Sequence, residues 1–360
     1  MNIYRSVSLL LCGLLISASS ALAIESTMPP DKYAEIIKPG FASKYTYIED
    51  GNFDEACNLP TYEWLPKDQP TKAVIIGVHG LTLHGRRYRV LARTMAVNGI
   101  AFVAPDMLGF GKNRFDEKWQ HDGEKKKART RAHHEKSYEA IVKLAQAVRQ
   151  KYPSIPVICA GESLGCTFAV RLAAEHPELI TGMILSAPAV KVNPLMYASP
   201  GDIKAGLTAM TNLTGMVNLK GFFTNLVSGR SEVVNEMIDD PYIVKELSLG
   251  ELLSTDEFVE KTVKWGKNID QSMPVLIIQG SADKCVVPKH VTDLMMVIPS
   301  QDQQVSWRGS FGHLQLETAF MRASIIDSIG DWLQDHSTEN RTRLEELEKN
   351  VADLGGTLVR

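Results

Sequence analysis

The sequence predicts an α/β fold in which a mostly parallel β-sheet is covered by helices on both faces. Short apolar runs of strand type alternate with segments of helical spacing, which is the pattern of repeated strand-helix-strand units. A serine lies in a glycine-bearing turn between one strand and the next helix, and one long helix-favouring segment interrupts the alternation. The chain has 360 residues, 44% of them hydrophobic, and is long enough for a sizeable core. Its net charge of -3 argues against a nucleic-acid partner.

The expected strands are apolar runs bounded by turn residues. The run at 73–78 is apolar throughout, which is typical of a central strand that is buried on both faces. We expect strands at 44–48, 61–65, 73–78, 100–104, 157–160, 183–186, 275–279 and 304–307. Apolar residues at spacings of three and four predict helices at 86–98, 137–152, 166–176 and 316–334.

The pentapeptide Gly161-Glu162-Ser163-Leu164-Gly165 lies between an expected strand and an expected helix. A GxSxG sequence in this setting is typical of a sharp strand-to-helix turn that exposes a serine hydroxyl, and its glycines make the tight turn sterically possible. The pentapeptide therefore predicts an enzyme with Ser163 as its nucleophile.

The strand-helix alternation stops at Ala187 and resumes at Pro274. The segment between them favours helices and is rich in Leu, Met, Phe and Val, so it is at least a packed helical subdomain. Because it follows the strand after the serine turn, at the sheet edge where open α/β folds bind ligands, we also expect it to cover the nucleophile. We therefore divide the chain into a core in two parts, 24–186 and 274–336, and a helical cap at 187–273.

A serine hydroxyl needs a base to take its proton and a third group to orient that base. Asp283 lies just after the expected strand at 275–279, and His313 follows the expected strand at 304–307. The chain order of Ser163, Asp283 and His313 is that of α/β-hydrolases and differs from the orders of chymotrypsin and subtilisin. These three residues are the expected catalytic triad.

The negative charge that develops on a substrate carbonyl oxygen needs donors that are already in place. The backbone amide of Leu164, directly after the nucleophile, is one expected donor. The other is the amide of Leu81, in the turn His79-Gly80-Leu81 after a central strand; a plain glycine turn is the alternative interpretation. We expect His79 to orient this loop. The next helix opens with residues that we interpret as packing or capping groups: His84, Arg86, Arg87 and Tyr88.

Together these motifs resemble the monoacylglycerol lipase and lysophospholipase branch of the α/β-hydrolases, over roughly 44–334. The resemblance implies an α/β-hydrolase fold with an eight-stranded sheet and an inserted cap. It also implies no cofactor or metal, and hydrolysis of carboxylic esters with an apolar acyl chain through the same triad and amides, with single-chain acylglycerols or lysophospholipids as the small lipid or ester substrates. Cys166 and Lys112-Asn113 depart from the family pattern and leave the substrate open. The resemblance rests on His79-Gly80-Leu81, His84, Arg87, Tyr88, Leu91, 106–111, 161–165, 280–283 and Gly312-His313.

Two other functions stay open at this point. A peptidase, an amidase or a short-chain carboxylesterase could use the same triad, and nothing in the cap sequence separates these activities from lipid hydrolysis. A ligand-binding protein that has lost hydrolysis is the non-enzyme alternative, but the complete triad argues against it.

The N-terminal segment 1–23 has the order of a cleavable export signal. Arg5 precedes an apolar run at 7–16, and small residues end in Ala21-Leu22-Ala23. The apolar run is about half as long as a membrane span requires. We therefore expect an exported, periplasmic or secreted protein. In an oxidising compartment Cys57 and Cys285 could pair, whereas buried thiols are the default interpretation of Cys159 and Cys166.

Two charged segments remain. The run 114–136 is rich in Lys, Arg and His and is either a solvated helix face or a peripheral contact with anionic lipid. The tail 337–360 has leucines at spacings of three and four among charged residues, but Gly355-Gly356 interrupts the pattern. We expect the tail to dock on its own domain in a monomer or to pair weakly with a second copy.

Overall fold

The computed structural model describes residues 44–119, 131–191 and 213–337. The expected export signal 1–23, the middle of the basic segment and nearly all of the tail lie outside the described residues. Within the described residues, no helix has both the length and the apolar character that crossing a membrane requires.

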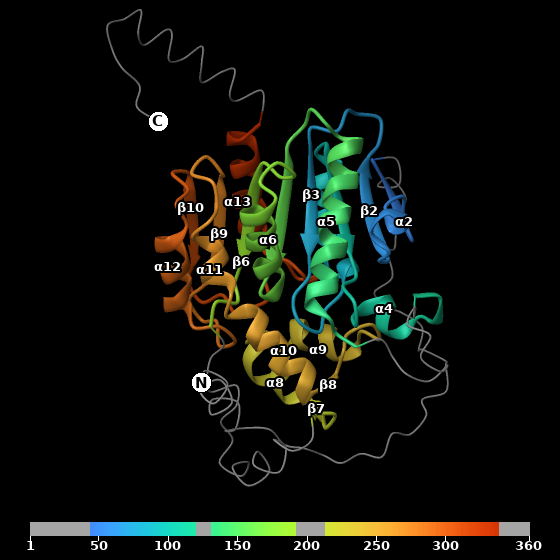
Figure 1. The fold of residues 1–360 in the computed structure, drawn as a ribbon, viewed down its shortest axis with the longest axis vertical. Coiled ribbons are helices and arrows are strands. Elements are labelled where there is room, and N and C mark those ends of the chain that lie inside the picture. Colours follow the sequence, from blue (N-terminus) through green and yellow to red (C-terminus); the bar gives the residue numbers. More distant parts are fainter. Residues whose placement is uncertain (1–43, 120–130, 192–212, 338–360) are drawn as a thin grey trace, which may run out of the picture.

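The core is an eight-stranded sheet (Figure 1). Each neighbouring pair from β4 to β10 is parallel, whereas β2 runs antiparallel to both β1 and β4. The parallel strands therefore end at one edge of the sheet, and this confirms the predicted fold class. In sheet order the strands are β1 (Tyr45–Glu49), β2 (Thr61–Pro66), β4 (Ile100–Pro105), β3 (Ala73–Val78), β5 (Val157–Glu162), β6 (Gly182–Ser186), β9 (Val275–Gly280) and β10 (Gln303–Arg308).

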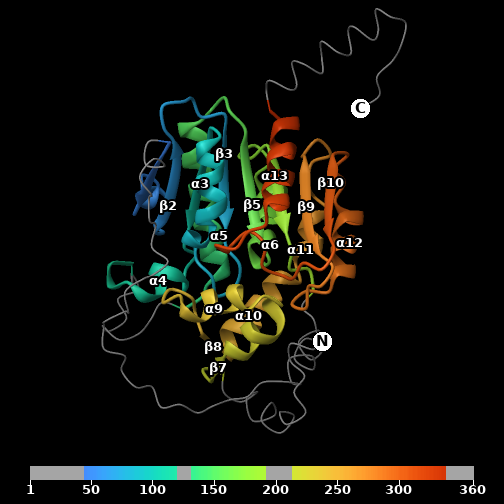
Figure 2. The same ribbon diagram turned by 180° about the vertical axis from the view of Figure 1, so that it is seen from behind.

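Helices cover both faces of the sheet, as expected. On one face lie α5 (His134–Lys151), α6 (Leu164–Glu175) and α12 (Pro288–Val297), and on the other lie α3 (Arg89–Val97) and α13 (Ala323–Asp335), as Figures 1 and 2 show. Each face has its own apolar cluster, because β-strand side chains alternate between the two sides. The shorter helical segments of the core are α2 (Asp54–Cys57), η1 (Gly85–Tyr88), α4 (Gly111–Phe115) and η2 (Glu117–Trp119). Near the end of the segment expected to be the cap, α11 (Thr262–Gly266) packs against the core helices α6 and α12.

The last helix begins later than the sequence pattern predicts. The expected helix started at residue 316, whereas α13 starts at Ala323. Backbone amides between these positions donate hydrogen bonds to two buried carboxylates, those of Glu162 and Glu236. Because these contacts satisfy the amides without a helix, the segment before α13 forms a loop.

The described part of the cap lies against the carboxyl ends of the parallel strands (Figures 1 and 2). It contains helices and also a two-stranded antiparallel sheet that the sequence did not predict, because each strand has only three residues and shows no periodicity. The cap elements are β7 (Met216–Asn218), α8 (Lys220–Phe222), the π-helical turn η4 (Phe223–Val227), α9 (Ser231–Asp239), β8 (Glu246–Ser248) and α10 (Leu249–Val259).

Buried ion pairs attach cap helix α9 to the core. Glu236 accepts hydrogen bonds from Arg87 Nη2 at 3.1 Å and from Arg89 Nη2 at 2.5 Å. Asp240, directly after α9, contacts His84 Nε2 at 3.0 Å and Arg87 Nη1 at 3.6 Å. Two of the residues expected to be packing or capping groups, His84 and Arg87, therefore fasten the cap to the core, whereas Tyr88 bonds to Val78 O within the core.

We expect Glu236→Gln to lower the free energy of unfolding by about 3 kcal/mol, because Arg87 and Arg89 would lose a buried counter-charge. Urea unfolding followed by circular dichroism measures this change. Glu232→Gln is the matched control on the same helix, since Glu232 pairs with Arg230 at the surface and should matter little. Equal unfolding midpoints for the two variants would contradict this account of the cap.

The two ends of the basic run are also docking contacts. Arg114 Nη1 lies 3.0 Å from Glu251 Oε1, and His134 Nε2 lies 2.8 Å from Thr255 Oγ1, with all four residues buried. Both partners belong to cap helix α10. The interpretation of the run as a solvated or lipid-facing surface is therefore wrong for Arg114 and His134.

The four cysteines of the described residues, Cys57, Cys159, Cys166 and Cys285, are buried free thiols. The expectation of buried thiols therefore holds for Cys159 and Cys166. Cys57 and Cys285 are not paired with each other.

Candidate active site

Ser163 lies in the sharp turn that joins β5 to α6. Its backbone has φ 54° and ψ −116°, a strained conformation for a residue with a side chain. The turn is held on both sides, because Ser163 N donates to Ser186 O at 2.9 Å and Ser163 O accepts from Cys166 N at 3.1 Å. The strain is thus stored at the residue that the sequence selects as the nucleophile.

The two glycines of the pentapeptide are required by close backbone contacts. A Cβ atom on Gly165 would lie 1.9 Å from the carbonyl oxygen of Val78, at the end of β3. A Cβ atom on Gly161 would lie 2.4 Å from the backbone of Gly165. The glycines therefore let the helix that begins after Ser163 pack directly on two central strands.

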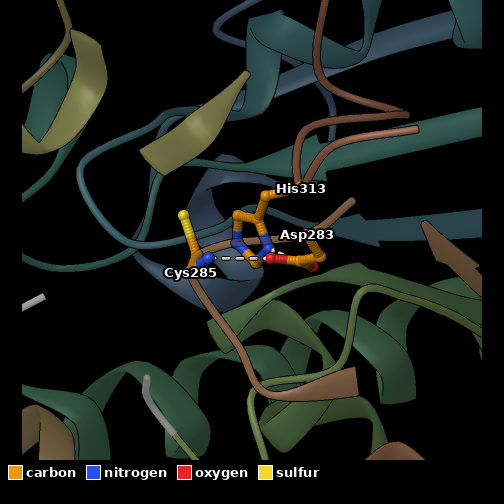
Figure 3. A group of neighbouring side chains, drawn as sticks. All are labelled: Asp283, Cys285 and His313. Atoms are coloured by element: carbon orange, nitrogen blue, oxygen red, sulfur yellow. Dashed lines mark hydrogen bonds and ion pairs between the residues drawn. The ribbon is translucent and has the colours of Figure 1, made fainter. Parts of the chain in front are cut away.

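The structure brings Asp283 and His313 together from two separate loops. His313 Nδ1 lies 2.8 Å from Asp283 Oδ2 (Figure 3). The other carboxylate oxygen, Oδ1, accepts from the backbone amides of Cys285 and Val286 at 2.8 and 3.1 Å, and Gln279 Nε2 donates to Oδ2 at 3.2 Å. Asp283 is thereby fixed in position to orient the imidazole ring.

The electrostatics of this pair suit a general base. Burial opposes ionisation of Asp283, but His313 and the hydrogen-bond donors outweigh burial and lower the pKa of the carboxyl group. Burial likewise opposes the charged imidazole, yet the contact with Asp283 raises the pKa of His313 above its usual value. When His313 is neutral, its proton stays on Nδ1 and faces Asp283, so Nε2 can accept a proton.

Cys285 places a thiol next to this pair, as Figure 3 shows. Ligand atoms of Asp283, Cys285 and His313 lie within 4.8 Å of one another, and these residue types can bind zinc. Burial and the nearby Asp283 charge raise the pKa of the Cys285 thiol well above its usual value. Asp283 and His313 bond to each other, and the second oxygen of Asp283 accepts from two backbone amides, so the arrangement of the cluster fits proton transfer.

The two expected oxyanion donors lie at the carboxyl ends of neighbouring strands. Leu164 is the first residue of α6, so its amide has no partner within the helix. Leu81 lies in the loop after β3. His79 orients that loop, because Met107 N donates to Nε2 at 3.0 Å and Nδ1 then donates to Gly80 O at 2.8 Å. Burial lowers the pKa of His79 to about 3, so this side chain is neutral and structural.

Sequence reasoning missed three buried polar side chains around the site. Gln279 contacts Asp283, Glu317 Oε2 accepts from Gly80 N at 2.9 Å, and Glu162 accepts from backbone amides that follow His313. For Gln279 and Glu162 the available signal was local, because each is a polar residue at the end of an otherwise apolar run; Glu317 lies in a mixed segment and has no such signal. Such residues are buried only when they have hydrogen-bond partners.

The comparisons with known proteins agree with this geometry. Residues 69–317, more than half of the chain, match the model of the serine aminopeptidase S33 family. The chain belongs to this family. The match contains the strained serine turn, Asp283 and His313, so the site of this S33 hydrolase lies within the family's shared region.

Relatives of this S33 hydrolase include monoglyceride lipases. The chain is 27% identical over 276 residues to the rat and human enzymes, which covers 75% of this chain and 84% of each of them. The monoglyceride lipase homolog of monkeypox virus is 26% identical over 271 residues, or 75% of this chain and 92% of the viral protein. The resemblance to the monoacylglycerol lipase branch is confirmed.

Solved structures share the fold. A soluble variant of the Saccharomyces cerevisiae monoglyceride lipase superposes with a TM-score of 0.65 at 19% identity, covering 87% of this chain and 99% of that one. The Paleococcus ferrophilus monoacylglycerol lipase gives 0.60 at 23% identity, covering 78% and 99%. The α/β-hydrolase fold is thus confirmed independently of the site residues.

Proposed function

We propose that this protein hydrolyses carboxylic esters with an apolar acyl chain, monoacylglycerols above all, through an acyl-enzyme on Ser163. The observation that carries the proposal is the buried Asp283–His313 pair at the same sheet edge as the strained Ser163 turn. The monoglyceride lipase relatives support the choice of an ester bond and of a lipid substrate.

The proposed mechanism has two symmetrical halves. His313 Nε2 takes the proton of Ser163 as its hydroxyl oxygen attacks the ester carbonyl carbon. The amides of Leu81 and Leu164 stabilise the oxyanion, and Asp283 stabilises the imidazolium that forms. His313 then protonates the leaving alcohol, and a water molecule, activated in the same way, releases the fatty acid from Ser163.

The cap supports an apolar substrate because it contacts the base directly. The backbone amide of His313 donates to Val227 O, at the end of η4, at 3.1 Å. Phe222 and Leu226, on the same cap segment, are only partly buried and pack against the main apolar cluster. An acyl chain bound beside His313 would therefore meet apolar side chains of the cap.

A substrate panel tests the proposed specificity. We expect the highest kcat/KM with monoacylglycerols of medium or long acyl chain, lower values with short p-nitrophenyl esters, and the lowest with amino-acid amides, because binding of each buried methylene adds up to about 0.8 kcal/mol. Lysophospholipids of the same chain length form the comparison arm. The family description names serine aminopeptidases, so faster cleavage of amino-acid amides would replace the ester assignment with a peptidase.

Export stays a proposal that rests on the sequence of residues 1–23. We expect expression of the full chain in a bacterial host to yield mature protein outside the cytoplasm that begins at Ile24. Cell fractionation and N-terminal sequencing measure this, and full-length protein confined to the cytoplasm would contradict it.

Contact of the basic segment with anionic membranes and pairing through the tail also stay predictions. Co-sedimentation with anionic vesicles at low and high salt tests the membrane contact. Light scattering of the chain with and without residues 337–360 tests the pairing.

A further inference from the structure

Glu162, the residue before the nucleophile, is fully buried and surrounded by donors. Ser186 Oγ, at the end of β6, donates to Glu162 Oε1 at 2.9 Å. Backbone amides of three consecutive residues also donate to the carboxylate, Gln315 at 2.7 Å, Leu316 at 3.0 Å and Glu317 at 2.9 Å. One side chain therefore satisfies four donors that would otherwise be buried without partners.

These contacts join the two halves of the catalytic machinery. Gln315, Leu316 and Glu317 follow His313 in the chain by two to four residues. Glu162 precedes Ser163 at the carboxyl end of β5. The loop that carries the base is thus hydrogen-bonded to the residue next to the nucleophile, more than 150 positions away in sequence.

The charge state of Glu162 follows from its partners. Three of them are backbone amides, which can only donate, whereas the Ser186 hydroxyl can donate or accept. Burial raises the pKa of Glu162 above its usual value, against the opposite effect of the three amides and of His313. The pKa of Glu317 is raised well above its usual value by burial and by the charge of Glu162. Glu162 is therefore the carboxyl group of this pair that ionises first, beside a neutral Glu317.

The other titratable groups near Glu162 leave this charge available to His313. Burial raises the pKa of Cys166 and of Tyr88 well above their usual values, so both are neutral. Arg87 interacts with Glu317 and donates to its carbonyl oxygen at 3.0 Å, but its guanidinium is paired with Glu236. The charge of Glu162 acts on His313 together with that of Asp283, and both raise the pKa of His313.

We propose that Glu162 is a positioning residue for ester hydrolysis: it fixes the His313 loop relative to Ser163 and places a second buried negative charge near the imidazolium of the transition state. This inference rests on the proposed function, since it assumes that Ser163 and His313 perform the chemistry. Glu162 itself touches neither substrate nor reacting atoms. Its effect should therefore appear in kcat and in the pH profile while KM changes little.

Glu162→Gln is the central test, with the folded variant assayed on a p-nitrophenyl ester. The amide NH2 of glutamine would face backbone N–H donors, and the charge would be lost. We expect kcat to fall about 10- to 100-fold, as for a small misplacement of a catalytic group, with KM nearly unchanged. In the plot of kcat/KM against pH, the acidic limb should move to lower pH. Loss of the negative charge lowers the pKa of His313, so the base stays neutral in more acidic solution.

Glu317→Gln is the matched control, because it replaces a neutral carboxylic acid with a neutral amide in the same buried region and should leave the acidic limb in place. Glu162→Asp separates charge from position: it should reduce kcat without moving the acidic limb. If Glu162→Gln does not fold, as judged by circular dichroism, the kcat of Glu162→Asp tests the proposal instead. A wild-type kcat in Glu162→Asp, or an acidic limb that does not shift in a folded Glu162→Gln, would overturn the proposal.

Failure of the substrate assignment would appear separately, as p-nitrophenyl ester cleavage by the wild-type enzyme without hydrolysis of monoacylglycerols.

Discussion

Replacing Ser163 by alanine should abolish ester hydrolysis almost completely, with kcat reduced by about 10⁴-fold or more. The loss follows because the acyl-enzyme cannot form without the hydroxyl, while the oxyanion donors and substrate binding alone support only slow attack by water. Initial rates on a p-nitrophenyl ester, with a fluorophosphonate probe to label the nucleophile, measure the effect.

Ser272→Ala is the control, because Ser272 is an exposed serine whose hydroxyl bonds only to Asp270 among the described residues. The control should keep wild-type activity and be labelled by the probe, whereas Ser163→Ala should not be labelled. Ester turnover near the wild-type rate in a folded Ser163→Ala enzyme would mean that another residue is the nucleophile.

Replacing Asp283 by asparagine should reduce kcat by about 10⁴-fold, although the shape of the side chain hardly changes. The two backbone amides would still bond to the Oδ1 position. The remaining oxygen site would then carry an NH2 group, which donates to His313 Nδ1 and so places the ring proton on Nε2. In this tautomer His313 cannot accept the proton of Ser163.

Asp293→Asn is the matched control for this change. Asp293 Oδ2 lies 2.7 Å from His290 Nδ1 on the surface of α12, so the variant alters the same kind of Asp–His pair outside the site. We expect wild-type kcat for Asp293→Asn. Similar activities for the two variants would show that Asp283 does not orient the base.

Local patterns in the sequence predicted most of the sheet and the position of the candidate site. The buried parallel strands are continuous apolar runs, so each could be recognised alone, and β3 and β9 lie where the runs were. Because parallel strands end at one edge, the residues that follow them come together, and the contact between Asp283 and His313 is an instance.

Contacts between distant segments could not be predicted in the same way. Glu236 and Arg87 are unremarkable charged residues in sequence, and only the docking of α9 on the core makes them a buried pair. The late start of α13 has a similar origin, because Glu162 competes for amides that local periodicity assigns to a helix. A period of three or four residues contains no information about a carboxylate more than 150 positions away.

The two ends of the cap insertion lie on neighbouring strands of the sheet. The chain leaves at the carboxyl end of β6 and returns at the first residue of β9, and because these strands are parallel its two ends lie at opposite edges of the sheet. The entropy of loop closure grows only slowly with length, so a substitute cap of another length would change it little. Under the proposed function, a foreign cap can be tried on the same catalytic machinery if it keeps the carboxylates of Glu236 and Asp240 that dock on Arg87 and Arg89.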